Sequence, residues 1–314
     1  MDIKLISKNC FKDYPLAKHS TLKVGGNAEF AYFPQSVEEL IQITSFHRQR
    51  EDKITVIGAG SNVLISSKGI TGAVILTKNL DSCELTGHNC IKAGSGLKST
   101  MLSKFAHKNG LSGVEFLIGI PGLVGGAVYM NSGAHGQQIK DTIVSAEVFD
   151  LKSDGILNFS KENLGLEYRH SRLIDGEHIV LNAVFRLQEE NPEKIQEFMT
   201  YQLDYRTKNH PPLSEPNAGS TFRNPENGIY IGKLLEDLNA KDWSEGGAAI
   251  SKKHANFLHN FDNATSLDIS KLMFKMYSEV KKQYGYELLA EIRYLGDMEE
   301  EEEEIWAQFQ KLKH

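Results

Sequence analysis

The stretch from Gly119 to Gly136 constrains the fold of this chain more than any other. It holds six glycines, one proline and one asparagine in eighteen positions, with almost no charge. Glycine alone adopts positive φ without steric cost, and it lacks the Cβ that keeps other molecules away from the backbone. We therefore predict a loop whose bare backbone is closely approached by a ligand.

A second glycine cluster follows the apolar run Ile54–Ile57 and reads Gly58-Ala59-Gly60-Ser61-Asn62. A strand that ends in such a turn presents successive N–H groups to phosphate oxygens. Two such loops predict one cofactor with a diphosphate, held from two sides. A pair of tight turns in a β-sandwich would show the same pattern. The dinucleotide-binding fingerprint is incomplete, because no third glycine and no later acidic residue stand at the required offsets.

Composition excludes several classes of protein. A chain of 314 residues has room for two or three domains, and its net charge of −6 offers no basic field to nucleic acid. Cys10, Cys83 and Cys90 show neither disulfide nor metal-ligand spacing, which is typical of a reducing cytoplasm. We see no signal peptide and no apolar run that could span a bilayer. The sequence predicts a cytoplasmic protein without a metal site.

Helices and strands are mixed without a strict βαβ alternation, which favours an α+β fold. The periodicity of apolar residues predicts helices at 37–51, 98–109, 193–206, 230–239 and 266–284, and strands at 54–57, 73–77, 179–187, 248–251 and 288–295. A hairpin joins 142–150 to 155–159. Four of the eight prolines lie between Asn209 and Asn227, and we place a domain boundary at the start of this segment.

The last residues differ in composition from the rest. Six consecutive glutamates, Glu299–Glu304, precede Ile305, Trp306, Phe309 and Leu312. Negative charge favours a helix N-terminus, and the apolar residues have helical spacing. A solvated terminal helix and an element that contacts another protein both fit this pattern.

Three separate residues could carry chemistry. Arg169 is a planar, permanently charged donor suited to a carboxylate or to developing enolate charge, although a surface ion pair would also explain it. Ser220 follows a glycine, as many turn serines do. Glu291 interrupts an apolar strand, where a carboxylate must face solvent or meet partners.

Seven short segments in one order make a stronger signal than any of these residues alone. They are Leu22–Ala28, Gly60–Asn62, Gly119–Gly136, Tyr168–Arg169 with Ser171, Gly219–Pro225, Gly246–Ala248 with His254–Phe257, and Glu291–Arg293. They are spread over nearly the whole chain, from Leu22 to Arg293. The chain thus resembles the UDP-N-acetylenolpyruvoylglucosamine reductase family of flavoenzymes. These enzymes catalyse the step that completes the synthesis of UDP-N-acetylmuramate, a precursor of bacterial peptidoglycan.

The resemblance implies a p-cresol methylhydroxylase-type FAD-binding fold. Its first lobe would comprise 1–78 with 286–296, its second lobe 79–209, and a substrate-binding domain 210–285, before the acidic segment 297–314. FAD would be held by Gly58, Ala59, Gly60, Ser61, Asn62, Pro121, Gly122, Gly125, Gly126, Asn131 and Gly133.

The resemblance also implies a reaction. NADPH would reduce the flavin, and a hydride would then reach carbon-3 of the enolpyruvyl group of a UDP-sugar. Arg169 and Glu291 match family residues that stabilise the enol-like intermediate, for which Glu291 needs a proton or a cationic partner. Ser220 matches the proton donor to carbon-2. Substrate contacts would come from Tyr168, Arg206, Lys208, Asn224 and Lys233.

Some positions depart from the family pattern. A glutamate common before the final catalytic one is absent from Leu288-Leu289-Ala290-Glu291. The short spacer from Arg169 to Arg206 resembles the branch that lacks an extra substrate-closing loop, which predicts a more open cleft. Two other functions stay open on the sequence: a flavin oxidase or dehydrogenase of the same fold, and a non-catalytic nucleotide-binding protein.

Overall fold

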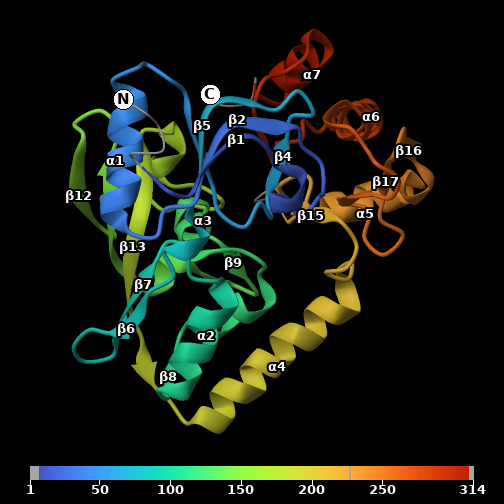
Figure 1. The fold of residues 1–314 in the computed structure, drawn as a ribbon. Helices are drawn as coiled ribbons and strands as arrows, with labels where there is room; N and C mark the ends of the chain where they lie inside the picture. The colour runs from blue at the N-terminus through green and yellow to red at the C-terminus, as the bar shows by residue number, and fades with distance from the viewer. Residues whose placement is uncertain (1–6, 226–227, 311–314) are drawn as a thin grey trace. The chain divides into compact units, whose positions relative to one another are not determined.

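The computed structural model describes residues 7–225 and 228–310, which form two compact units (Figure 1). The first unit holds 7–11, 30–59 and 72–208, and the second holds 12–29, 60–71, 209–225 and 228–310. The chain therefore passes between the units at 11/12, 29/30, 59/60, 71/72 and 208/209. The predicted domain boundaries, including the one at 209 and the division of 1–209 into two lobes, stay predictions.

The first unit contains four α-helices, a five-stranded sheet and part of a four-stranded sheet. In strand order, the five-stranded sheet is β12 (Gly155–Ser160), β11 (Ile143–Asp150), β13 (His178–Arg186), β7 (Cys90–Gly94) and β6 (Cys83–Leu85). The four-stranded sheet is β1 (Cys10–Pro15), β2 (Asn27–Tyr32), β5 (Ile70–Leu76) and β3 (Ile54–Ile57), and the chain changes unit within β1, β2 and β5. The helices are α1 (Val37–Arg48), α2 (Ser99–Lys108), α3 (Val124–Tyr129) and α4 (Pro192–Asn209). Leu40 and Ile43 of α1 are fully buried against strands of both sheets.

Two short antiparallel pairs complete this unit, β8 (Leu111–Ser112) with β14 (Gln188–Glu189) and β9 (Gly133–Ala134) with β10 (Gln137–Gln138). Single turns of 3₁₀-helix occur in the chain at Ala17–His19, Thr77–Asn79, Glu115–Gly119, Ile139–Asp141, Arg172–Asp175 and Ala240–Asp242. None of the helices in the described residues combines the length and apolar character that crossing a bilayer requires.

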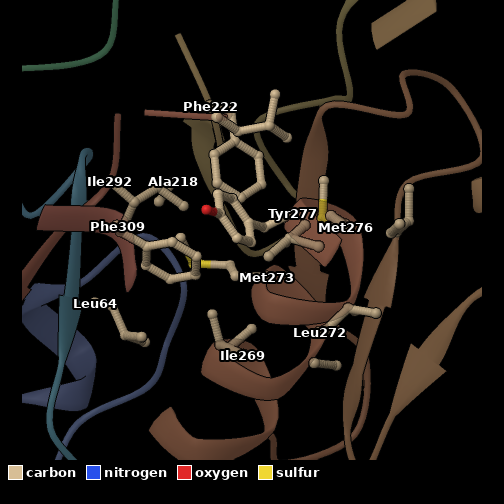
Figure 2. Packing of buried hydrophobic residues seen from close by; sticks show 14 of the residues in the cluster. Leu64, Ala218, Phe222, Ile269, Leu272, Met273, Met276, Tyr277, Ile292 and Phe309 are labelled. Atoms are coloured by element: carbon tan, nitrogen blue, oxygen red, sulfur yellow. The ribbon is translucent and has the colours of Figure 1, made fainter. Parts of the chain in front are cut away.

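The second unit packs a small sheet and three helices around one core. Its sheet has the order β15 (Asn217–Ser220), β18 (Phe257–Asn260), β17 (Ala248–Ile250) and β16 (Ser244–Glu245), and β4 (Val63–Ile65) runs parallel to β19 (Arg293–Leu295). The helices are α5 (Ile231–Asp237), α6 (Ser266–Tyr284) and α7 (Glu300–Gln310). Figure 2 shows the apolar face of α6 in this core, with Ile269, Leu272, Met273 and Met276 beside Phe222 and Phe309.

Local signals fix the ends of α6, which has the predicted bounds. Thr265 and Asp268 form a capping box, in which each side chain accepts from the backbone N–H of the other. Gly285 ends the helix in the left-handed conformation, with φ of 74°. The predicted strand 54–57 and the predicted hairpin are likewise confirmed, as β3 and as β11 with β12.

The predicted final strand 288–295 is wrong over most of its length. Only Arg293–Leu295 forms a strand, β19. The preceding residues pair with another segment, because Glu291 donates its N–H to Thr221 at 2.8 Å and Leu289 accepts from the N–H of Arg223 at 2.9 Å. The chain changes partner between these two pairings, so a single continuous strand cannot form.

Two other expectations need correction. Val124–Tyr129, in the middle of the predicted glycine-rich loop, forms the helix α3. The predicted terminal helix exists as α7, but one face of it is not solvated, since Ile305, Trp306 and Phe309 are buried. Leu312 lies outside the described residues.

One buried asparagine holds the segment 221–223. The Asn256 side chain donates to the carbonyl of Phe222 at 2.8 Å and accepts from its N–H at 3.0 Å. The Asn256 carbonyl also accepts from the N–H of Thr221 at 2.8 Å. The Asn256 side-chain amide thus makes the hydrogen bonds that a neighbouring strand would make in a sheet. The backbone groups of Phe222 need these partners because the residue is fully buried.

His254 supports the same asparagine. Its Nδ1 accepts from the N–H of Asn256 at 3.1 Å, and its ring lies 4.9 Å from that of Phe257. Only an unprotonated ring nitrogen can accept a hydrogen bond. Burial lowers the pKa of His254 below its ordinary value, which favours this neutral form.

Replacing Asn256 by alanine should destabilise the second unit, because it leaves both buried backbone groups of Phe222 without partners. Each such group costs about 1–3 kcal/mol, so the free energy of unfolding should fall by roughly 2–5 kcal/mol. Urea unfolding followed by tryptophan fluorescence measures this loss, since Trp243 and Trp306 both lie in this unit. Asn158→Ala, at an exposed position of β12, is the control. An equal loss in both variants would contradict the role of Asn256.

The contribution of His254 to stability should depend on pH. Its pKa is lower in the folded than in the unfolded chain, so the unfolded chain binds more protons in mild acid. The stability is therefore present at neutral pH and lost as pH falls below about 6.5. Unfolding midpoints between pH 7.5 and 5 should fall less for His254→Gln than for the parent. His88→Gln, at an exposed position, should match the parent, and parallel curves for all three proteins would refute this assignment.

Candidate active site

The predicted site residues fall into two groups, one in each unit. The first unit contains Gly58, Ala59, Pro121, Gly122, Gly125, Gly126, Asn131, Gly133, Tyr168, Arg169, Arg206 and Lys208. The second contains Gly60, Ser61, Asn62, Ser220, Asn224, Lys233 and Glu291.

In the first unit, the end of β3 lies against the glycine-rich segment. A Cβ added to Gly58 would stand 3.7 Å from the Leu123 side chain. Gly125 packs inward, since a Cβ there would come within 2.9 Å of Ser95. Gly126 is exposed, and a Cβ there would meet nothing within 4 Å. The outer face of this segment is therefore bare backbone, as close approach by a cofactor requires.

In the second unit, the turn at Gly60 tolerates no side chain. Its φ is 65°, and an added Cβ would stand 1.9 Å from the carbonyl oxygen of His19. Two residues later, the Asn62 side chain donates to the carbonyl of Glu291 at 3.1 Å. A predicted cofactor turn thus contacts a predicted catalytic residue.

Arg169 stands at the tip of a two-residue turn. Glu167 and His170 exchange backbone hydrogen bonds of 3.1 and 3.2 Å across it. Arg169 has a φ of 52°, a left-handed conformation that is uncommon outside glycine and clusters at functional sites. Its guanidinium donates to the carbonyl of Gly133 at 3.2 Å and lies over the Tyr168 ring. Here, too, a cofactor segment contacts a catalytic candidate.

The side chain of Asn131 holds this turn by hydrogen bonds. Its Nδ2 donates to the carbonyl of Glu167 at 2.7 Å and to Gln138, while its Oδ1 accepts from the N–H of Lys140 at 2.9 Å. The side chain is fully buried, so these contacts account for its amide. The predicted cofactor contact of Asn131 stays a prediction for its backbone.

A β-bulge presents Ser220. The pairing of β15 with β18 shifts register between Asn217 and Ser220, and Gly219 between them has φ of 76°. A bulge turns the following side chain away from the regular alternation of a strand. Ser220 is half-buried at this position and pairs with Phe257. The glycine before the serine is thus required by geometry.

The predicted substrate residues have diverse surroundings. Lys233 is exposed, and its Nζ forms an ion pair with Asp237 Oδ1 at 2.6 Å, which raises the pKa of the lysine. The Asn224 Oδ1 accepts from the N–H of Ile231 at the start of α5. Arg206 on α4 is half-buried, and burial lowers its pKa, although a guanidinium stays charged. Lys208 is exposed.

Sequence reasoning assigned no role to two residues that support the site. Asn256 holds the backbone beside Ser220, as described above. The hydroxyl of Ser171, which is fully buried, donates to the carbonyl of Tyr129 at 2.6 Å and ties the Arg169 turn to α3. Both residues lie in the segments that resemble the family, and this resemblance is the sequence signal that could have identified them.

Two family models match the chain. The FAD binding domain matches residues 28–159, and the C-terminal domain of UDP-N-acetylenolpyruvoylglucosamine reductase matches residues 211–295. The first range contains both glycine clusters, and the second contains Ser220, Asn224 and Glu291.

Relatives with this name match over almost their whole length. UDP-N-acetylenolpyruvoylglucosamine reductase of Caldicellulosiruptor saccharolyticus is 40% identical over 291 residues, covering 92% of each chain. The relative from Clostridium botulinum is 38% identical over 301 residues, covering 94% of this chain and 97% of its own.

A solved structure agrees. The crystal structure of UDP-N-acetylenolpyruvylglucosamine reductase from Thermus caldophilus has a TM-score of 0.77 and 31% identity, covering 91% of this chain and 98% of the other. Together with the domain matches, it confirms the predicted α+β flavin-binding fold with a C-terminal substrate domain. On these matches, the chain belongs to the UDP-N-acetylenolpyruvoylglucosamine reductase family.

Proposed function

We propose that this protein is an FAD-dependent oxidoreductase that uses NADPH to reduce the enolpyruvyl group of UDP-N-acetylglucosamine enolpyruvate. The product, UDP-N-acetylmuramate, is a precursor of peptidoglycan. The observation that carries the proposal is the contact of each predicted cofactor turn with a catalytic candidate. Arg169 bonds Gly133 in the first unit, and Asn62 bonds the backbone of Glu291 in the second.

The cofactor supplies hydride chemistry that no side chain can perform, passing a hydride equivalent from NADPH to carbon-3 of the substrate. The bare backbone at Gly126 fits a ligand that approaches the main chain. Backbone groups of Gly58–Asn62 and of the Pro121–Gly133 segment would hold its diphosphate and ribityl chain.

Protein groups control charge and protons in this proposal. Hydride arrival at carbon-3 pushes negative charge toward the substrate carboxylate. The planar Arg169 stabilises that charge, and a left-handed turn with two supporting side chains fixes its direction. Ser220 donates a proton to carbon-2, and Glu291 assists as a protonated acid or as a partner of a cation.

Substrate recognition draws on the basic end of α4 and on the second unit. Arg206 and Lys208 are proposed to contact the UDP-sugar. Lys233 is proposed for its diphosphate, since ammonium groups bind phosphate oxygens, and would have to leave Asp237. Tyr168 and Asn224 are proposed as further contacts. The substrate and NADPH are metabolites of the bacterial cytoplasm, where we propose that the enzyme acts.

The proposal is tested in two half-reactions under anaerobic conditions. The purified yellow protein should lose its flavin absorbance when NADPH is added. UDP-N-acetylglucosamine enolpyruvate should then restore the absorbance. A protein that is reduced but not reoxidised by this substrate would have another substrate, and one without bound FAD would not be a flavoenzyme.

Ser220→Ala should separate the half-reactions. Reduction of the flavin by NADPH needs no proton donor to the substrate, so its rate should change little. Reoxidation by the enolpyruvyl substrate should slow by about 10²–10⁴-fold, the usual contribution of a general acid. Stopped-flow absorbance measures both rates. Ser214→Ala, at an exposed position of the same unit, is the control, and equal slowing of both half-reactions would make Ser220 a structural residue.

Glu291→Gln should act on the second half-reaction alone. The substitution keeps the shape of the side chain but removes its charge and its acidic proton, so reoxidation should slow about 10²-fold in stopped-flow absorbance. FAD should stay bound. Glu287→Gln, which removes an exposed ion pair with Lys281, should leave both rates unchanged. A Glu291→Gln variant with the parental rate of reoxidation would exclude the carboxylate from the reaction.

A further inference from the structure

Helix α7 lies outside the residues that the family models match, which end at 295. It nevertheless completes the core of the second unit. Ile305, Trp306 and Phe309 are 7%, 4% and 5% exposed, and all three belong to the cluster around α6. Glu301, Glu303 and Glu304 are exposed on the opposite face. The helix is therefore amphipathic and docked.

Specific polar contacts fix the position of α7. The Trp306 Nε1 donates to the Ser270 hydroxyl of α6 at 2.9 Å, and both groups are buried. One glutamate of the acidic run, Glu302, is also buried and accepts from the Tyr294 hydroxyl at 2.8 Å. Indole and phenol groups seek such partners when buried, so these bonds select one docked arrangement. Lys271 of α6 adds a surface ion pair with Glu301 at 3.0 Å.

The docked helix reaches the backbone of the proposed site through Phe309. Its ring meets the ring of Phe222 edge-on, with 5.8 Å between centroids, and packs in the same way on Tyr277. Figure 2 shows Phe309 beside Phe222 and Ile292. Phe222 lies two residues after Ser220, and Ile292 directly follows Glu291. Phe222 also pairs with Ala290, the residue before Glu291.

We propose that Phe309 and Trp306 are positioning residues for the reaction. They pack α7 against the core that contains Phe222 and Ile292. This packing fixes the two segments that carry Ser220 and Glu291. The inference rests on the proposed function. Neither side chain touches the substrate, and both act through the core of the second unit. Ser220 and Glu291 are proposed to act on the substrate and not on the reductant, so flavin reduction by NADPH should depend little on the helix.

The mechanism is geometric. Edge-to-face aromatic contacts prefer a narrow range of ring positions. Removing the Phe309 ring leaves space into which Phe222 can move, and the backbone beside Ser220 moves with it. A displacement of about 1 Å at a reacting group can slow a reaction by about 10²-fold.

The test uses the full-length FAD-loaded enzyme at a temperature well below its unfolding midpoint. Phe309→Ala should slow the limiting rate of reoxidation at saturating substrate by roughly tenfold or more. Reduction by NADPH should stay within about twofold of the parent. Phe309→Leu fills most of the space and should recover most of the rate, at about threefold below the parent. The paired variant Glu303→Gln/Glu304→Gln changes only the exposed face of α7 and should behave as the parent.

The possible results are distinguishable. Equal slowing of both half-reactions, or parental reoxidation in a folded Phe309→Ala protein, would overturn the positioning role. If Phe309→Ala does not fold, Phe309→Leu decides: selective slowing supports the proposal, and the parental rate refutes it. Failure of the proposed function has a different signature, because the parent enzyme itself would then not be reoxidised by the enolpyruvyl substrate.

Discussion

The pairing of the Asn256 side chain with the backbone of Phe222 is the contact on which the second unit depends. It satisfies a buried N–H and a buried carbonyl where no strand is available. The segment held in this way begins one residue after Ser220. The carbonyl of its first residue, Thr221, accepts the N–H of Glu291. Phe222 also receives the ring of Phe309. One amide therefore links a loop, a catalytic candidate and the C-terminal helix.

Local patterns predicted the elements whose causes are local. The bounds of α6 follow from an apolar stripe and a capping box within a single segment, and β3 follows from four β-branched residues before a glycine. The strand predicted at 288–295 failed because its two ends pair with different partners, which no local pattern reveals. The apolar spacing of α7 was visible, but Ser270, which receives the Trp306 N–H, lies 36 residues away.

The candidate site shows the same division. Arg169, Ser220 and Glu291 could be named because short segments around them resemble a family. The left-handed backbone of Arg169 could not be predicted, since it depends on Asn131 and Ser171 beneath the turn. The resemblance implied Lys233 as a substrate contact, and its ion pair with Asp237 four residues later on α5 is a local contact. Resemblance thus indicates the chemistry of a residue, whereas contacts distant in sequence decide the direction of side chains such as Arg169.

The interleaving of the two units has a consequence for synthesis on the ribosome. Leu22, Val24 and Leu64 belong to the same core as Phe309, although nearly the whole chain separates them. The first unit is complete once residue 208 has emerged, but the other residues of the core that contains these three lie at 218 and beyond. Early apolar segments without partners are prone to aggregation during translation. The apolar surface around Leu22, Val24 and Leu64 is therefore expected to stay exposed during translation until the later part of the second unit has emerged.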